Sequence, residues 1–342
     1  MPEDAKMKEA LLYDRLDKDR VRCRLCTHQC LIKPGKTGLC GVRQNQGGRL
    51  VTLVYGRAIS VNIDPIEKKP LFHFLPGTLS MSIATVGCNF VCSFCQNSDI
   101  SQMPRDEGRI IGQDLPPAEV VDRALKGRAA TIAYTYTEPT IYFEYTLDTA
   151  RAASEAGLKN IFVTNGYMSE AALDMIGSDL HAANVDLKAF TDEFYKKRCR
   201  ARLEPVKETI VRMKARGIWI EVTTLIIPGL NDDERELGEL AEWLAGVSPE
   251  IPWHISKFYP TYHLTDIGPT PTATIHRARE IGLKAGLRYV YSGNVWGDEG
   301  EKTFCHNCGR LLIDRVGYHI SENSIRQGAC PDCHAPVAGV WD

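Results

Sequence analysis

The sequence contains no run of about 18 or more apolar residues, so it predicts no transmembrane helix. The first twenty residues, MPEDAKMKEALLYDRLDKDR, are charged and lack the apolar core of a secretory signal. A net charge of −2 over 342 residues excludes a uniformly basic protein. A hydrophobic content of 44% is nevertheless enough to form a full core. We therefore expect a cytoplasmic protein with one larger domain and small appendages.

Cysteine is abundant by contrast. Twelve cysteines in a chain expected to be intracellular favour metal ligation over disulfides. Eleven of them fall into three groups, and only Cys199 stands alone. A lone cysteine of this kind is expected to be a buried, inert thiol, with a redox or radical-relay role as the alternative.

The central group is Cys88, Cys92 and Cys95, spaced C-x3-C-x2-C within TVGCNFVCSFCQN. Three thiolates at this spacing can bind three irons of a cubane [4Fe–4S] cluster and leave the fourth iron without a protein ligand. An open metal position is typical of a catalytic site. The spacing resembles that of the radical S-adenosylmethionine (SAM) superfamily, in which the amino and carboxylate groups of SAM occupy the open iron.

The C-terminal group is Cys305, Cys308, Cys330 and Cys333, spaced C-x2-C-x21-C-x2-C. Each C-x2-C pair is typical of a tight turn that directs two sulfurs at one ion, and two such turns complete a tetrahedral site. We interpret residues 297–342 as a zinc ribbon whose metal supplies its folding energy, with a rubredoxin-like iron as the competing interpretation.

The N-terminal group is Cys23, Cys26, Cys30 and Cys40, spaced C-x2-C-x3-C-x9-C. We expect a closed four-cysteine site that holds either zinc or a second iron–sulfur cluster, and His28 is a possible substitute ligand. Between Arg20 and Leu50 there are five arginines and two lysines with no acidic residue, a net charge of +7. Such a patch would attract polyanions, and the alternative interpretation is a solvated face.

Between these modules the chain alternates strand-like and helix-like stretches, which is typical of repeated β/α units. Helices are predicted at Pro116–Leu125, Tyr142–Ala156 and Leu237–Leu244, the last preceded by an Asn231–Glu234 capping pair. The expected strands are Ser80–Val86, Thr131–Tyr136, Asn160–Thr164, Asn184–Leu187, Trp219–Ile227, Trp253–Phe258 and Tyr289–Tyr291.

Six core strands and one edge strand predict an α/β fold, a partial (β/α)6 barrel similar to a TIM barrel, whose chemistry gathers at the carboxyl ends of the strands. The predicted domains are a four-cysteine module (1–50), a connecting segment (51–78), the barrel (79–296) and the zinc ribbon (297–342).

Residues at those strand ends resemble radical SAM enzymes of the pyruvate formate-lyase-activating type. Glu138 lies where that family has a Gly-Gly-Glu-Pro segment, and the resemblance implies that its carboxylate receives the amino group of SAM. Tyr136 and Thr137 replace the two glycines. By the same resemblance, Asn165 of the Thr-Asn-Gly sequence contacts SAM.

Asp186 and Lys188 match the Asp-x-Lys sequence of the same family, so the resemblance places them on the carboxylate and ribose of SAM. Val163 stands where those activators carry an aspartate, which argues against their bound alkali cation here.

The segment DPIEKKPLFHFLPG, the basic four-cysteine N-terminus, TLIIPGLND, PWHISKFYP and YVYSGNV together resemble the radical SAM member of the AmmeMemoRadiSam system. That resemblance runs from about Cys23 to the last residue. It implies a Memo-like protein and an AMMECR-type protein as partners, with flavodoxin or ferredoxin as an electron donor.

The resemblance implies a reaction in which the reduced cluster cleaves SAM to methionine and a 5′-deoxyadenosyl radical, which abstracts hydrogen from a substrate. An RNA or protein substrate is expected. A glycyl radical enzyme activase and a non-catalytic metal-bound adaptor are the alternatives. His73, Lys68 and Lys69 could reach the barrel mouth or lie in a solvated loop. His254 could be catalytic or structural.

Overall fold

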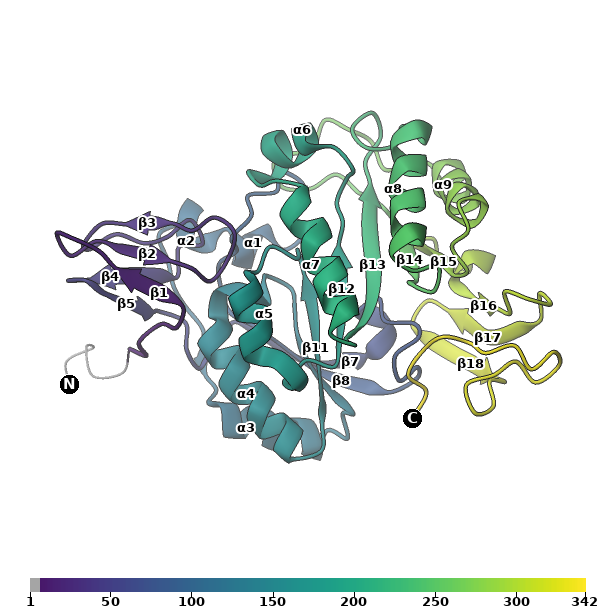
Figure 1. Ribbon diagram of the computed structural model, residues 1–342, viewed down its shortest axis with the longest axis horizontal. Coiled ribbons are helices and arrows are strands. Elements are labelled where there is room, and N and C mark those ends of the chain that lie inside the picture. The colour runs from purple at the N-terminus through teal and green to yellow at the C-terminus, as the bar shows by residue number, and fades with distance from the viewer. Residues whose placement is uncertain (1–6) are drawn as a thin grey trace. The chain divides into compact units, whose positions relative to one another are not determined.

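A computed structural model describes residues 7–342, so the first six residues of the charged N-terminal stretch lie outside the described residues. The chain divides into two compact units. Unit one runs to Asp64 and resumes from Leu79 to His181, whereas unit two consists of Pro65–Thr78 and Ala182–Asp342. The fold is mixed α/β with a central sheet of eight strands (Figure 1).

Unit one supplies the central strands β7 (Ser60–Pro65), β8 (Leu79–Ala84), β10 (Thr131–Tyr134) and β11 (Lys159–Thr164). Strand β10 pairs in parallel with both β8 and β11. All four residues of β10 are buried, as expected for a parallel strand that is covered on both faces. The helices of this unit are α1 (Ser98–Ser101), α2 (Met103–Asp106), α3 (Pro117–Lys126), α4 (Phe143–Glu155) and α5 (Glu170–Ile176).

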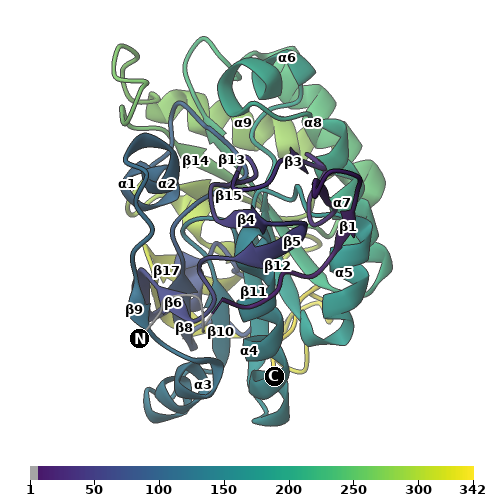
Figure 2. The same cartoon turned by 90° about the vertical axis from the view of Figure 1, so that its left-hand side faces the viewer.

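Short antiparallel sheets precede these strands in unit one. Their pairing can be followed in the purple part of Figure 1, and in Figure 2, where β4 and β5 face the viewer. One sheet has the order β1–β2–β3, β4 and β5 form a hairpin, and β6 pairs antiparallel with the distant strand β9. The strands are β1 (Tyr13–Arg15), β2 (Val21–Cys23), β3 (Leu31–Ile32), β4 (Arg43–Gln46), β5 (Arg49–Thr52), β6 (Arg57–Ala58) and β9 (Gln113–Asp114).

Unit two supplies four parallel strands, β12 (Ala182–Asp186), β13 (Trp219–Ile226), β14 (Trp253–Lys257) and β15 (Val290–Gly293). Its helices are α6 (Asp192–Phe194), α7 (Glu204–Ala215), α8 (Glu234–Val247) and α9 (Thr272–Lys284). Helices α8 and α9 pack side by side in both views. A π-helical turn, Tyr195–Cys199, follows α6, and 3₁₀ turns lie at Ile66–Lys68, Pro139–Tyr142, Gly177–Asp179 and Glu299–Glu301.

A three-stranded antiparallel sheet follows in unit two, with β16 (Thr303–Phe304), β17 (Leu311–Val316) and β18 (His319–Asn323). Its apolar residues share a core with Phe72, Tyr289 and Tyr291 of the same unit. The C-terminal ribbon is therefore packed on the body of unit two as well as on its own metal-ligand residues.

These elements confirm the predicted fold class. All seven predicted strands are present, and the three predicted helices are α3, α4 and α8. The predicted Asn231–Glu234 cap is wrong, because the Asp233 side chain accepts from the Glu236 backbone N–H at the start of α8. The Asn231 amide instead donates to the carbonyls of Lys188 and Leu225. Among the described helices, none has the length and apolar character needed to cross a membrane.

Candidate active site

The loop after β8 carries the central cysteine group. Cys88 and Cys92 are buried, and the Phe90 backbone N–H donates to Cys88 Sγ at 3.3 Å. Cys95 Sγ lies 3.1 Å from Ser101 Oγ at the end of α1. Burial, and secondarily the charge of Glu138, raises the pKa of the Cys88 thiol. Hydrogen bonds to the sulfurs are one of the means by which a protein tunes an iron–sulfur cluster, so the polar groups of this loop fit such a ligand.

Glu138 follows β10 and is completely buried. Its Oε1 accepts from the Thr140 N–H at 3.0 Å, from the Thr140 hydroxyl at 2.6 Å and from the Thr164 hydroxyl at 2.8 Å. Its Oε2 accepts from the Asn165 N–H at 2.8 Å. Burial raises the pKa of this carboxyl, and the hydrogen bonds from Thr140 and Asn165 oppose that rise. A carboxylate oxygen has room for a second donor, so Oε2 can accept one from a ligand.

Asn165, at the end of β11, connects the carboxylate with the cysteine loop. Its Nδ2 donates to Asn89 Oδ1 at 2.7 Å and lies 3.9 Å from Cys88 Sγ. The structure therefore brings Cys88, Glu138 and Asn165 together within unit one. A hydroxyl of the same loop, Ser93 Oγ, is buried without a partner in the described part of the chain. The loop thus contains sulfur ligands and a buried hydroxyl that is able to donate to a sulfide of a cluster.

Tyr136 is a functional candidate that sequence reasoning undervalued. It replaces a family glycine, and its φ of +63° is the left-handed conformation that a bulky residue rarely adopts. Its hydroxyl donates to Asp64 Oδ2 at 2.6 Å, and Asn97 Nδ2 donates to its carbonyl at 2.7 Å. Burial and the Asp64 bond raise the pKa of this phenol to about 12. These two contacts hold the strained backbone in place, so the glycine-like turn exists without glycine.

Asp186 and Lys188 lie at the end of β12 in unit two. Lys188 Nζ is 2.9 Å from Asp186 Oδ2, and both side chains are only partly exposed. The Lys188 backbone is also fixed, because its N–H donates to the Tyr195 hydroxyl and its carbonyl accepts from Asn231. The two residues form a positioned ion pair, and their contact with SAM stays a prediction.

A family model described as the radical SAM superfamily matches residues 82–243, the span that contains the cysteine loop, Glu138 and Asn165. An uncharacterized protein of Methanocaldococcus jannaschii is 47% identical over 310 residues, which cover 90% of this chain and 92% of that protein. The chain belongs to the radical SAM superfamily.

Two more distant similarities were also found. A second protein of Methanocaldococcus jannaschii, provisionally named a glycyl-radical enzyme activating enzyme, is 25% identical over 46% of this chain and 66% of its own length. A radical SAM methyltransferase structure from Sphaerobacter thermophilus superposes with a TM-score of 0.51 at 19% identity, covering 70% of this chain and 71% of that one. The second similarity concerns the fold alone.

The C-terminal cysteines of this radical SAM protein are brought together as predicted. The sulfurs of Cys305, Cys308, Cys330 and Cys333 all lie within 4.8 Å of one another. Two of the separations are 3.5 Å and 3.7 Å, close to the roughly 3.8 Å that a tetrahedral Zn–S site implies. The set can hold one metal ion.

Other predicted candidates have structural roles. His254 is buried, and its Nε2 is 2.6 Å from Glu221 Oε2. His73 is buried between the Ala338 carbonyl and the Tyr291 hydroxyl, and Lys69 is also buried. The solvated-loop alternative is therefore wrong for His73 and Lys69. Cys199 is completely buried, as expected for an inert thiol.

Proposed function

We propose that this protein is a radical SAM enzyme that cleaves SAM reductively to a 5′-deoxyadenosyl radical, which abstracts hydrogen from an RNA or protein substrate. The cluster and SAM supply that radical chemistry when bound. The proposal rests above all on one observation, the buried network that joins Glu138, Asn165 and Cys88 in unit one. Electron supply from a flavodoxin or ferredoxin, and Memo-like and AMMECR-type partners, belong to the same proposal.

In this proposal each residue of the chain has a limited task. Cys88, Cys92 and Cys95 bind three irons. Glu138 Oε2 accepts a hydrogen bond from the ammonium of SAM, and the four bonds already made to the carboxylate keep it fixed. Bonds to a charged acceptor are about twice as strong as neutral ones. Asn165, Asp186 and Lys188 orient the carboxylate and ribose of SAM.

A macromolecular substrate is favoured by the basic N-terminal module, with one correction to its charge. Arg43 is 1% exposed and forms an ion pair with Glu144 at 3.0 Å, so it does not belong to the surface patch. Arg24 lies 2.5 Å from Asp14, and Arg49 lies 3.9 Å from Glu9. The positively charged surface is therefore smaller than the sequence count suggests. The exposed side chains of Lys33 and Lys36 still contribute positive charge to it.

Activation of a glycyl radical enzyme is the second candidate function, because the activating-enzyme relative matches almost half of this chain. The cysteine loop and the Glu138 network would serve that reaction equally well. The adaptor alternative is disfavoured, since a non-catalytic protein would have no need of a fixed carboxylate beside the three-cysteine loop.

The experiment is anaerobic cluster reconstitution followed by addition of SAM and dithionite. We expect 5′-deoxyadenosine and methionine as products. A Cys88→Ala, Cys92→Ala, Cys95→Ala variant should lose at least about 100-fold of this activity, because its cluster has no ligands. A Cys199→Ala variant is the matched control and should retain it. Undiminished product from the triple variant would disprove the assignment.

A further inference from the structure

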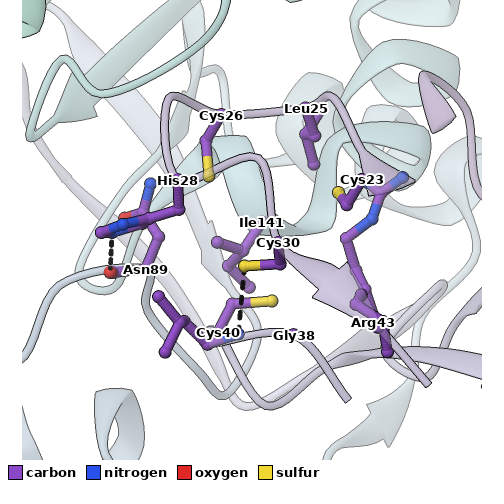
Figure 3. Close-up of a pocket in the computed structure, with 12 residues that line it drawn as sticks. Cys23, Leu25, Cys26, His28, Cys30, Gly38, Cys40, Arg43, Asn89 and Ile141 are labelled. Carbon is purple, nitrogen blue, oxygen red and sulfur yellow. Dashed lines mark hydrogen bonds between the residues drawn. The ribbon is translucent and has the colours of Figure 1, made fainter. Parts of the chain in front are cut away.

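The four N-terminal cysteines border a single pocket inside unit one (Figure 3). Cys23 ends β2, Cys26 and Cys30 lie in the loop before β3, and Cys40 lies in the turn before β4. The rest of the lining is mainly apolar, with Leu25, Ile32, Leu39 and Ile141. Four thiols that line one pocket fit a metal ion or a cluster, which would bind them as thiolates.

The C-terminal ribbon provides an internal standard for the size of the ligand. Its four sulfurs all lie within 4.8 Å of one another, as they must around one ion. Among residues 7–342 no second group of three or more His, Cys, Asp or Glu ligand atoms meets that limit. No three of the N-terminal sulfurs therefore lie as close together as the sulfurs of the ribbon do. Thiolates that bind different irons of a cubane stand farther apart than thiolates that share one ion.

Two buried donors on this pocket have no acceptor. Arg43 Nε and Asn89 Nδ2 find no hydrogen-bond partner in the described part of the chain, although these residues are 1% and 2% exposed. An unpaired buried donor costs roughly 1–3 kcal/mol, so native structures seldom leave one without a ligand. A metal centre on the four cysteines would supply acceptors, because metal-bound thiolate sulfurs accept hydrogen bonds, and a cubane cluster would add its inorganic sulfides to them.

The histidine alternative is disfavoured. His28 Nε2 is 2.8 Å from the Asn89 carbonyl oxygen, a contact drawn as a dashed line in Figure 3. That contact leaves only Nδ1 of His28 for a metal, whereas all four cysteines line the pocket, so the four cysteines are the simpler ligand set.

We propose that the N-terminal pocket holds a second [4Fe–4S] cluster with Cys23, Cys26, Cys30 and Cys40 on its four irons. Such a centre accepts one electron from a low-potential donor and returns it, whereas zinc is redox-inert. It would lie beside the loop of the first cluster, because Gly87 packs against this module. A Cβ built on Gly87 would meet the Cys40 carbonyl oxygen at 2.9 Å. The inference does not depend on SAM cleavage, and its tests do not measure that reaction.

The first test is metal analysis of the full-length chain after anaerobic reconstitution with iron, sulfide and zinc. Two cubane clusters and one ribbon ion predict about eight irons, eight sulfides and one zinc per chain. Four irons and two zincs would overturn the proposal and assign the N-terminal site to zinc. The wild-type chain is sufficient for this comparison, so no outcome depends on the folding of a variant.

The second test separates the two clusters. The Cys88→Ala, Cys92→Ala, Cys95→Ala variant should retain about four irons and give an electron paramagnetic resonance signal on dithionite reduction. A Cys26→Ala, Cys40→Ala variant should lose about four irons and keep the signal of the first cluster. Cys199→Ala should keep all eight. An iron-free triple variant would overturn the proposal, even if the wild-type chain cleaves SAM.

Discussion

At the scale of single residues, a sequence motif predicts some side chains of the candidate site but not the contacts of others. Glu138 and Asn165 were predictable because they follow apolar strands in a known family pattern. The Arg43–Glu144 ion pair was not, since the partners lie 101 positions apart and each looks like an ordinary surface charge in the sequence. In the sequence, Tyr136 only replaces a flexible glycine of the family pattern. The structure shows that its hydroxyl donates to Asp64 while its backbone is left-handed.

Replacing Glu138 with glutamine should weaken SAM affinity about 10-fold or more without loss of iron. An amide accepts a weaker bond from an ammonium than a carboxylate does, and its NH₂ group would face donors that now bond the acid. The measurement is SAM binding by calorimetry beside iron analysis. Glu119→Gln on the exposed face of α3 is the control, because it removes one surface charge of the same kind. Equal SAM affinity in the two variants would rule out this role.

At the scale of elements, the regular β/α units were the predictable part. Apolar runs such as Ile132–Tyr134 in β10 and Ile161–Val163 in β11 identify buried parallel strands. For His73, Lys68 and Lys69 the sequence leaves two interpretations open, a reach to the barrel mouth or a solvated loop, and neither predicts the buried contacts of Pro65–Thr78. In the structure the Phe72 and His73 backbone N–H groups donate to Glu221 on β13, and Glu221 is itself completely buried. Sequence patterns do not reveal a partner that lies 149 positions away.

His73 should make the stability of this segment depend on pH. Burial lowers its pKa to about 4 from an ordinary 6.5. A depressed histidine contributes stability that is fully present above pH 6.5 and is lost as the pH falls toward 4. In urea unfolding, the free energy of unfolding of the wild-type chain should therefore be lower at pH 5 than at pH 7. This difference should be smaller in His73→Gln.

His319 is an exposed histidine on β18, so His319→Gln is the matched control for that measurement. It should show the same decrease in the free energy of unfolding between pH 7 and pH 5 as the wild-type chain. Glu221 also makes the protein less stable as the pH falls, in a lower pH range. Burial raises the pKa of Glu221, but the hydrogen bond and the charge of His254 oppose burial, and the pKa is lowered overall. An identical pH dependence in all three chains would contradict the role of His73.

At the scale of the whole molecule, three cysteine sets serve different purposes in one chain. The C-terminal set was predicted to organise an independent ribbon. The structure modifies that expectation, because the ribbon shares its core with Phe72, Tyr289 and Tyr291 of unit two. Metal binding and side-chain packing therefore both stabilise the ribbon.

Cys330→Ser should remove about one zinc per chain and make residues 297–342 sensitive to protease. Structural zinc contributes roughly 10 kcal/mol or more in isolated modules, and part of that stabilisation would be lost here. The measurements are zinc analysis, limited proteolysis and thermal unfolding, with Cys199→Ser as the control for a buried thiol. Unchanged zinc content and an intact ribbon would contradict a four-cysteine site.

The contacts of His73 and Leu75 with the C-terminal residues also have a consequence for folding during synthesis. His73 and Ala338 are bonded across 265 positions, and the Leu75 N–H donates to the Val340 carbonyl. A ribosome that adds roughly 5–20 residues per second needs about 13 to 50 s to synthesise the residues between His73 and Ala338. During that interval Phe72 and Phe74 have been synthesised but lack their final neighbours. The late synthesis of these partners is a structural reason for Pro65–Thr78 to need protection from aggregation in the nascent chain.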